Sequence, residues 1–260
     1  MKNTFVTYYS KHYHYLYQHL NDSICAFSEA DIVDYDARDI NDEAMQKNEM
    51  LEYFRNKIRV IIDTLKYSTN YDNYLWLDTD TIVNENIDKI WSQSEKITTC
   101  PLLCKYAYYN LNYYYAGEDV IYHNLIEKLD IKYDIKDFVY RQANAILYNK
   151  NCLGFFEEAL EIFNRFFDEG EYYIPMGDES IFNVLLLKYK NSDSLGDINF
   201  CSISNSIVEY YYFKDRPIEE FLERYNAKRD NRNEILLFHG NKYSNIIKYD
   251  IKRIKEYVGK

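Results

Sequence analysis

The chain has 260 residues, enough for one large domain or two small ones with a sizeable core. It contains only 7 glycines and 3 prolines, and no glycines stand in a G-x-G or G-x-x-x-x-G-K arrangement, which excludes the common dinucleotide and phosphate loops. The net charge of −11, without a dense stripe of Lys and Arg, argues against nucleic acid or an anionic membrane as the main partner.

The first part of the chain predicts strands and helices in alternation. Residues 5–8 predict a strand, 11–21 a helix and 24–27 a second strand. Apolar residues at three- and four-residue intervals then predict a long amphipathic helix over residues 42–67. The apolar run 74–77 that follows is typical of a central strand in a mostly parallel sheet.

The alternation continues toward the C-terminus. Residues 87–91 predict a short helix, and 138–148 predict a strand pair or one long strand. Residues 153–167 and 178–189 predict helices, and 235–238 a last buried strand. Because no Pro-, Gly- or Ser-rich linker interrupts this order, we expect one α/β domain with a mixed, mostly parallel sheet flanked by helices.

Cysteine usage and hydropathy bear on the compartment. The five cysteines are scattered and show no zinc-site spacing, which favours reduced thiols and a cytoplasmic protein. Tyr, His and Lys interrupt the N-terminal segment, and no run of about 18 apolar residues occurs, so we expect neither a secretory leader nor a transmembrane segment.

The most informative motif follows the run 74–77, where Asp78 and Asp80 stand one residue apart. In open α/β sheets, ligands gather at the carboxyl ends of strands. Two carboxylates there repel each other unless a cation lies between them, so the motif predicts a divalent metal site. A solvated turn after a strand is the alternative interpretation.

Two classes of enzyme carry such an acidic strand end. The haloacid-dehalogenase-like phosphohydrolases use a D-x-D on their first strand, with Asp78 and Asp80 as nucleophile and acid/base, although Thr81 comes one place early. The chain also resembles metal-dependent nucleotide-sugar glycosyltransferases of the GT-A fold. In these, a nucleotide-binding half precedes the motif, as two candidate strands and a long helix do here.

Three downstream segments strengthen the second resemblance. The segment with Asn144 and Ala145 is similar to the Asn-Ala/Ser-Gly strand beside the donor sugar and acceptor, except that Ile146 stands where Gly is usual. Asp178 and Glu179 begin a segment similar to the Asp-Gln/Glu-x-x-x-Asn helix start, although an ordinary acidic first turn looks the same.

The last segment ends a strand with a histidine. His239 with Lys242 is similar to the His-x-x-Gly-x-x-Lys element, with Gly240 and Lys242 earlier than usual. The closest likeness is to small retaining hexosyltransferases of the glycogenin and bacterial lipooligosaccharide galactosyltransferase type, which build polysaccharides.

The resemblance implies a site and a cofactor. Asp80 and His239 would bind Mn²⁺ or Mg²⁺, Asp78 would bind the metal or the ribose, and Lys242 would neutralise the diphosphate of a UDP-sugar. It further implies a nucleotide-binding half at 1–100, an acceptor and donor-sugar half at 101–242, and a basic C-terminal helix at 243–260.

The remaining donor-side candidates are less specific. Tyr8 could stack on the base, and Asp36 could accept a hydrogen bond from base or ribose, although a solvated loop explains Asp36 equally well. Lys57 and Arg59 lie where a cation near the diphosphate is expected, or are surface charges.

On the sugar side, one of Asp178 and Glu179 would hold donor hydroxyls, and the other would face the anomeric carbon. The tyrosine-rich residues 106–115 could form a platform for a glycan acceptor. The basic residues of 246–258 could touch a membrane that carries a lipid-linked acceptor. A catalytically inactive carbohydrate-binding GT-A domain is a further alternative.

Overall fold

The computed structural model describes ten stretches of the chain. They are residues 1–10, 13–36, 42–83, 86–105, 125–132, 141–168, 177–191, 193–195, 198–202 and 235–239. The predicted elements at 246–258 and the tyrosine-rich residues 106–115 lie outside them. The described elements form two compact units, each built from separate segments of the chain.

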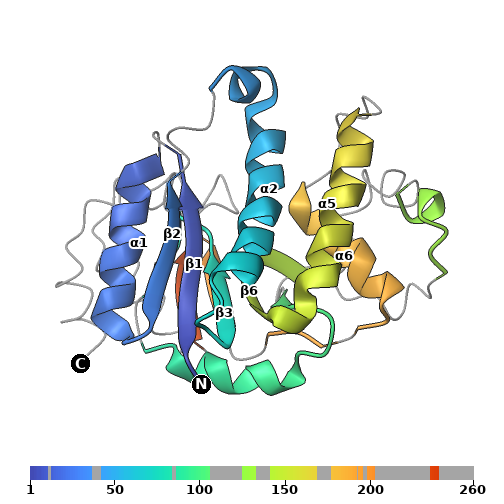
Figure 1. The fold of residues 1–260 in the computed structure, drawn as a ribbon. Helices are drawn as coiled ribbons and strands as arrows, with labels where there is room; N and C mark the ends of the chain where they lie inside the picture. Colours follow the sequence, from blue (N-terminus) through green and yellow to red (C-terminus); the bar gives the residue numbers. More distant parts are fainter. Residues whose placement is uncertain are drawn as a thin grey trace. The chain divides into compact units, whose positions relative to one another are not determined.

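The described residues of the first unit form three helices of 11 or more residues, three strands and a short helical turn at 125–128 (Figure 1). Its elements in chain order are α2 (Asp42–Tyr67), β3 (Asn73–Leu77), β5 (Leu102–Lys105), β6 (Arg141–Asn149), α5 (Leu153–Asp168) and α6 (Asp178–Lys188), with the short 3-10 turn η5 (Lys150–Cys152) before α5. Within this unit the strand order is β3-β6-β5, with β5 and β6 antiparallel. Helices α2, α5 and α6 pack on one another, and α6 also packs on β6.

The core of this unit follows from the sequence pattern. Ile58, Ile61 and Leu65 recur along one face of α2 and are almost fully buried, as the helical periodicity predicts. All five residues of β3 are buried, which agrees with a strand covered on both faces. Helix α6 is covered nearly all around, because its polar Asp178, Ser180 and Asn183 are buried together with its apolar residues.

The second unit contains two small sets of strands and one helix. Its elements are β1 (Asn3–Tyr9), α1 (His14–Phe27), β2 (Asp31–Asp36), β4 (Ile82–Val83), β7 (Ile198–Ser202) and β8 (Ile235–His239). Strands β1 and β2 pair in parallel. Strand β8 pairs in parallel with β7 and antiparallel with β4, so the predicted mixed α/β architecture is confirmed.

Three segments differ from what the sequence predicts. Residues 24–27 form the last turn of α1, not a strand, because Leu16, Leu20 and Ile24 give that helix its buried face. The backbone of Asp36, for which the sequence leaves a solvated loop as one alternative, belongs to β2. The predicted short helix at 87–91 is a longer 3-10 segment, η3 (Asp88–Lys96).

Candidate functional site

The acidic motif occupies a tight turn after β3. The carbonyl oxygen of Asp78 accepts a hydrogen bond from the Thr81 amide at 3.0 Å, which closes a four-residue turn. Asp80 is only 7% exposed and Asp78 is half-buried. The turn therefore holds two carboxylates in a partly desolvated place, which disfavours an ordinary solvated turn.

The strand after this turn pairs with the strand that ends in His239. In the antiparallel register of β4 and β8, Ile82 stands opposite Phe238. The ladder ends at this pair, so Thr81 and His239 are the next residues of the two segments at the same end of the ladder. The register thus brings the end of β8 to the acidic turn.

The donor types at this end fit a hard divalent cation. Carboxylate oxygens and an imidazole nitrogen are suitable ligands for Mn²⁺, and carboxylates for Mg²⁺. The buried hydroxyl of Thr81 has no hydrogen-bond partner among the described residues. The described side chains contain no group of three potential metal ligands, and the His239 side chain is not among them. Lys242 also lies outside the described residues.

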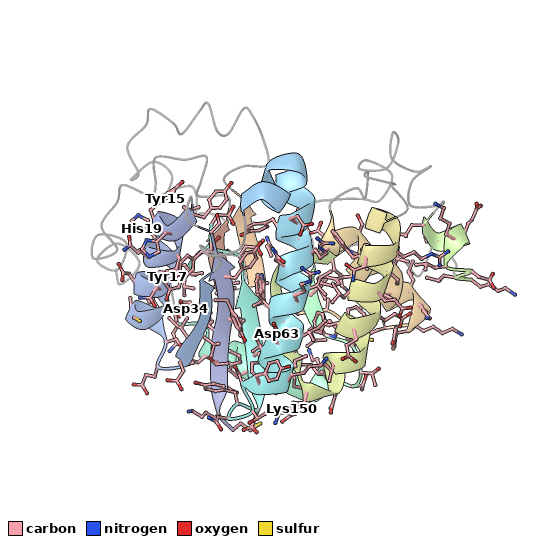
Figure 2. All side chains as sticks on the ribbon, turned by 45° about the horizontal axis from the view of Figure 1, so that its top comes forward. Tyr15, Tyr17, His19, Asp34, Asp63 and Lys150 are labelled. Atoms are coloured by element: carbon pink, nitrogen blue, oxygen red, sulfur yellow. The ribbon has the colours of Figure 1, made fainter. Side chains whose placement is uncertain are left out.

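The ends of β1 and β2 carry an aromatic cluster. Tyr8 is only 2% exposed, which leaves little of its ring open to a base. The ring of Tyr9 stacks on that of Tyr17, with 4.2 Å between centroids. Burial raises the pKa of Tyr17 to about 12, and so do the charge of the Asp34 carboxylate and a hydrogen bond to it. Figure 2 labels Tyr17 on α1 and Asp34 on β2. The side chain of Asp36 is not described, and its backbone pairs with Tyr9.

In the first unit, the start of α6 is fixed by a glycine. Gly177 has a φ of 55°, a region that L residues rarely adopt, and a Cβ there would overlap the Phe54 ring of α2. Only glycine therefore fits both the backbone conformation and the packing. Asp178 is the next residue and the first of α6.

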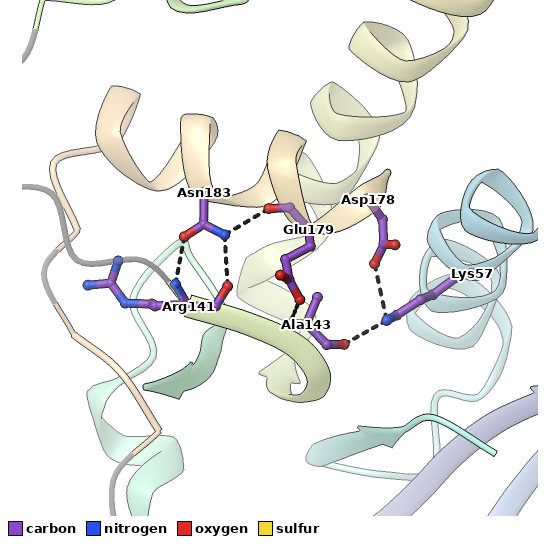
Figure 3. A network of polar contacts seen from close by, with 6 residues as sticks. All are labelled: Lys57, Arg141, Ala143, Asp178, Glu179 and Asn183. Atoms are coloured by element: carbon purple, nitrogen blue, oxygen red, sulfur yellow. Dashed lines mark hydrogen bonds and ion pairs between the residues drawn. The ribbon is translucent and has the colours of Figure 1, made fainter. Parts of the chain in front are cut away.

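Asp178 forms a buried ion pair with Lys57 (Figure 3). The Lys57 ammonium lies 3.1 Å from the Asp178 carboxylate and donates to the Ala143 carbonyl at 2.6 Å. It also lies over the Trp76 ring, 5.3 Å from the centroid. Because its side chain is 4% exposed, Lys57 is not a surface charge, whereas Arg59 on the same helix is exposed.

Glu179 and Asn183 connect α6 to the backbone of β6. A carboxylate oxygen of Glu179 accepts a hydrogen bond from the Ala143 amide at 2.8 Å. The Asn183 side chain accepts from the Arg141 amide at 2.9 Å and donates to the Arg141 carbonyl at 2.8 Å. The acidic helix start is thus part of a network that joins α2, β6 and α6 (Figure 3).

The predicted donor-sugar strand is the middle of β6. Asn144 is 4% exposed, and its side-chain oxygen has no hydrogen-bond partner among the described residues. Ala145 and Ile146 are fully buried, so the isoleucine that replaces the usual glycine is part of the core. A buried amide oxygen without a partner is suited to bind a ligand hydroxyl.

The buried cysteines are poor nucleophiles. Cys25, Cys100, Cys104 and Cys152 are free thiols. Burial raises the pKa of Cys152 to about 12 and that of Cys104 well above its usual range, with the Glu179 charge adding to the latter shift. These two thiols stay protonated at neutral pH, which excludes a thiolate role for them.

The predicted residues divide between the units. Lys57, Asn144, Ala145, Asp178 and Glu179 gather in the first unit, and Tyr8, Asp36, Asp78, Asp80 and His239 belong to the second. Sequence reasoning missed the roles of Phe54 and Gly177. The isolated glycine before an acidic helix start is the one signal that could have indicated the positive φ.

The fold is that of GT-A glycosyltransferases, which confirms the fold predicted from the sequence. The chain is similar to the galactosyltransferase LgtC, solved in complex with donor and acceptor sugar analogs. The TM-score is 0.55 and the identity 13%, over 98% of this chain and 95% of that chain. No protein-family model and no curated protein matches the sequence.

Proposed function

We propose that the chain is a metal-dependent glycosyltransferase that moves a hexose-type sugar from UDP to a hydroxyl of a glycan or lipid-linked acceptor, with retention. The observation that supports the proposal is the pairing of β4 with β8 in a GT-A fold, because Ile82, just after the Asp78–Asp80 turn, stands opposite Phe238, the residue before His239. The similar galactosyltransferase was solved with donor and acceptor sugar analogs.

Asp78, Asp80 and His239 would hold Mn²⁺ or Mg²⁺ at the carboxyl end of β3. When bound, the metal supplies positive charge against the diphosphate of the departing nucleotide. The chain's own contribution is to fix the carboxylates in a closed turn and to add the ammonium of Lys242. Asp36 would contact the nucleotide at the end of β2, whereas the Tyr8 ring is too buried to stack on the base.

The sugar side belongs to the first unit. Asp178 would orient donor hydroxyls, and its ion pair with Lys57 holds its carboxylate in one position. Asn144 and Ala145 would lie along the sugar, with the unpartnered amide oxygen of Asn144 accepting from a hydroxyl. The free thiols agree with a cytoplasmic enzyme.

The rival functions have less support. The phosphohydrolase alternative needs the D-x-D on the first strand, but here it follows the third strand along the chain. An inactive carbohydrate-binding domain would need no metal ligands, and all three candidates are present. Neither alternative requires turnover of a UDP-sugar, so turnover separates them from the proposal.

The test is release of UDP from a panel of UDP-hexoses, with Mn²⁺ or with a chelator. We expect at least one donor to be consumed only with the metal, and Asp80→Asn to lower the rate by at least about 100-fold, as loss of a charge-stabilising group does. Asp63→Asn, which changes an exposed carboxylate of α2, is the control (Figure 2). Turnover that persists with the chelator or with Asp80→Asn contradicts the proposal.

A further inference from the structure

The edge of β6 near the proposed sugar site is completed by side chains. Arg141 and Ala143 are alternate residues of the strand, so their peptide groups point to the same edge. Asn183 satisfies both the amide and the carbonyl of Arg141, Glu179 satisfies the Ala143 amide, and Lys57 satisfies the Ala143 carbonyl. All four backbone groups thus have partners, as buried peptide groups require.

The geometry of α6 suits this task. Glu179 and Asn183 are four residues apart and share one helix face, with a rise of about 6 Å between them. Two residues of a strand span about 6.7 Å, which nearly equals this rise. Glu179 can therefore contact Ala143 while Asn183 contacts Arg141. Asn183 also donates to the Glu179 carbonyl at 2.8 Å, which ties the two positions together. The helix face acts as a substitute for a neighbouring strand (Figure 3).

We infer that Glu179 is a positioning residue, whose carboxylate holds the Ala143 amide and thereby fixes Asn144 relative to Asp178. The inference rests on the proposed function, because Asn144 and Asp178 are the residues assigned to the donor sugar. For this role the Glu179 side chain must be long enough to bring an acceptor oxygen to the Ala143 amide, but it need not be charged. This separates its role from that of a carboxylate that faces the anomeric carbon.

Two variants distinguish the effect of the length of the Glu179 side chain from the effect of its charge. Glu179→Gln keeps the length and one acceptor oxygen but removes the charge, whereas Glu179→Asp keeps the charge and shortens the side chain by one methylene. Amide hydrogen exchange of Ala143, followed by NMR with ¹⁵N-alanine labelling, reports the hydrogen bond directly. UDP affinity and kcat are measured on the same samples, with the exposed Glu157→Gln as control.

We expect Glu179→Gln to stay within about threefold of wild type in exchange rate and in kcat. Glu179→Asp is expected to raise the exchange rate of Ala143, and to lower kcat, by at least about tenfold, as loss of a buried hydrogen bond predicts. UDP affinity should change in neither variant, since the proposed nucleotide ligands lie on other elements.

Two results overturn the inference: a loss of kcat in Glu179→Gln while Ala143 stays protected, or unchanged protection of Ala143 in Glu179→Asp. If wild type consumes no UDP-sugar at all, the proposed function falls, and the exchange rates alone still decide whether Glu179 holds the strand.

Discussion

The buried Lys57–Asp178 pair gives the most quantitative prediction. Lys57→Met removes an ammonium that lies 3.1 Å from the Asp178 carboxylate, with both side chains almost fully buried. The variant leaves an uncompensated buried charge, which costs about 3–5 kcal/mol in the free energy of unfolding. The Ala143 carbonyl also loses a donor, and the Trp76 ring loses its cation, so the upper half of that range is expected.

A double-mutant cycle isolates the pair. Lys57→Met combined with Asp178→Leu removes both charges, so no isolated carboxylate remains. We expect the double variant to be more stable than Lys57→Met alone, with a coupling energy of at least about 1.5 kcal/mol. Urea unfolding followed by tryptophan fluorescence measures these differences, because Trp76 lies beside Lys57.

The matched control is another lysine of α2. Lys66 pairs with Glu157 at 2.7 Å, but both side chains are well exposed, so Lys66→Met should leave the unfolding midpoint unchanged within error. The reasoning is refuted if Lys57→Met is no less stable than Lys66→Met, or if the double variant is as unstable as the single one.

The remaining predictions concern the helix start and the aromatic cluster. Gly177→Ala should lower the free energy of unfolding by at least about 2 kcal/mol, because it combines backbone strain with overlap on Phe54. Gly154→Ala is the control, because a Cβ at that position meets nothing within 4 Å. It should leave the free energy of unfolding unchanged or raise it by up to about 1 kcal/mol. An equal loss of stability in both variants would contradict the packing argument. Because the folded-state pKa of Tyr17 is raised from 10.0 to about 12, its contribution is complete below pH 10 and is lost as pH rises through 12. The stability deficit of Tyr17→Phe, measured by urea unfolding, should therefore shrink between pH 10 and 12, and a constant deficit would show that the hydroxyl is not held in this way.

Strong periodicity made parts of the fold predictable. The helix at 42–67 has the bounds of α2, since its apolar residues recur on one face over many turns. The segment 24–27 was assigned to the wrong element because a short apolar run fits a strand and a buried helix end equally well. The two-residue strand β4 carries too little pattern to be found from sequence.

The sequence predicts residue types for the candidate site but not their pairings. The D-x-D motif points to Asp78 and Asp80, because two carboxylates one residue apart after a buried strand are chemically unusual. Lys57 gave no sign of burial, since a lysine on an amphipathic helix is normally solvated. The partner of Glu179 is a backbone amide, and such partners leave no trace in side-chain sequence.

Calorimetric titration with UDP, with and without Mn²⁺, tests the central claim that the acidic turn is part of a metal-dependent nucleotide site. Wild type and Asp63→Asn should bind UDP only when Mn²⁺ is present, and Asp80→Asn should not bind it measurably under either condition. Binding of UDP that is independent of both Mn²⁺ and Asp80, or absence of binding by wild type with Mn²⁺, would contradict the claim.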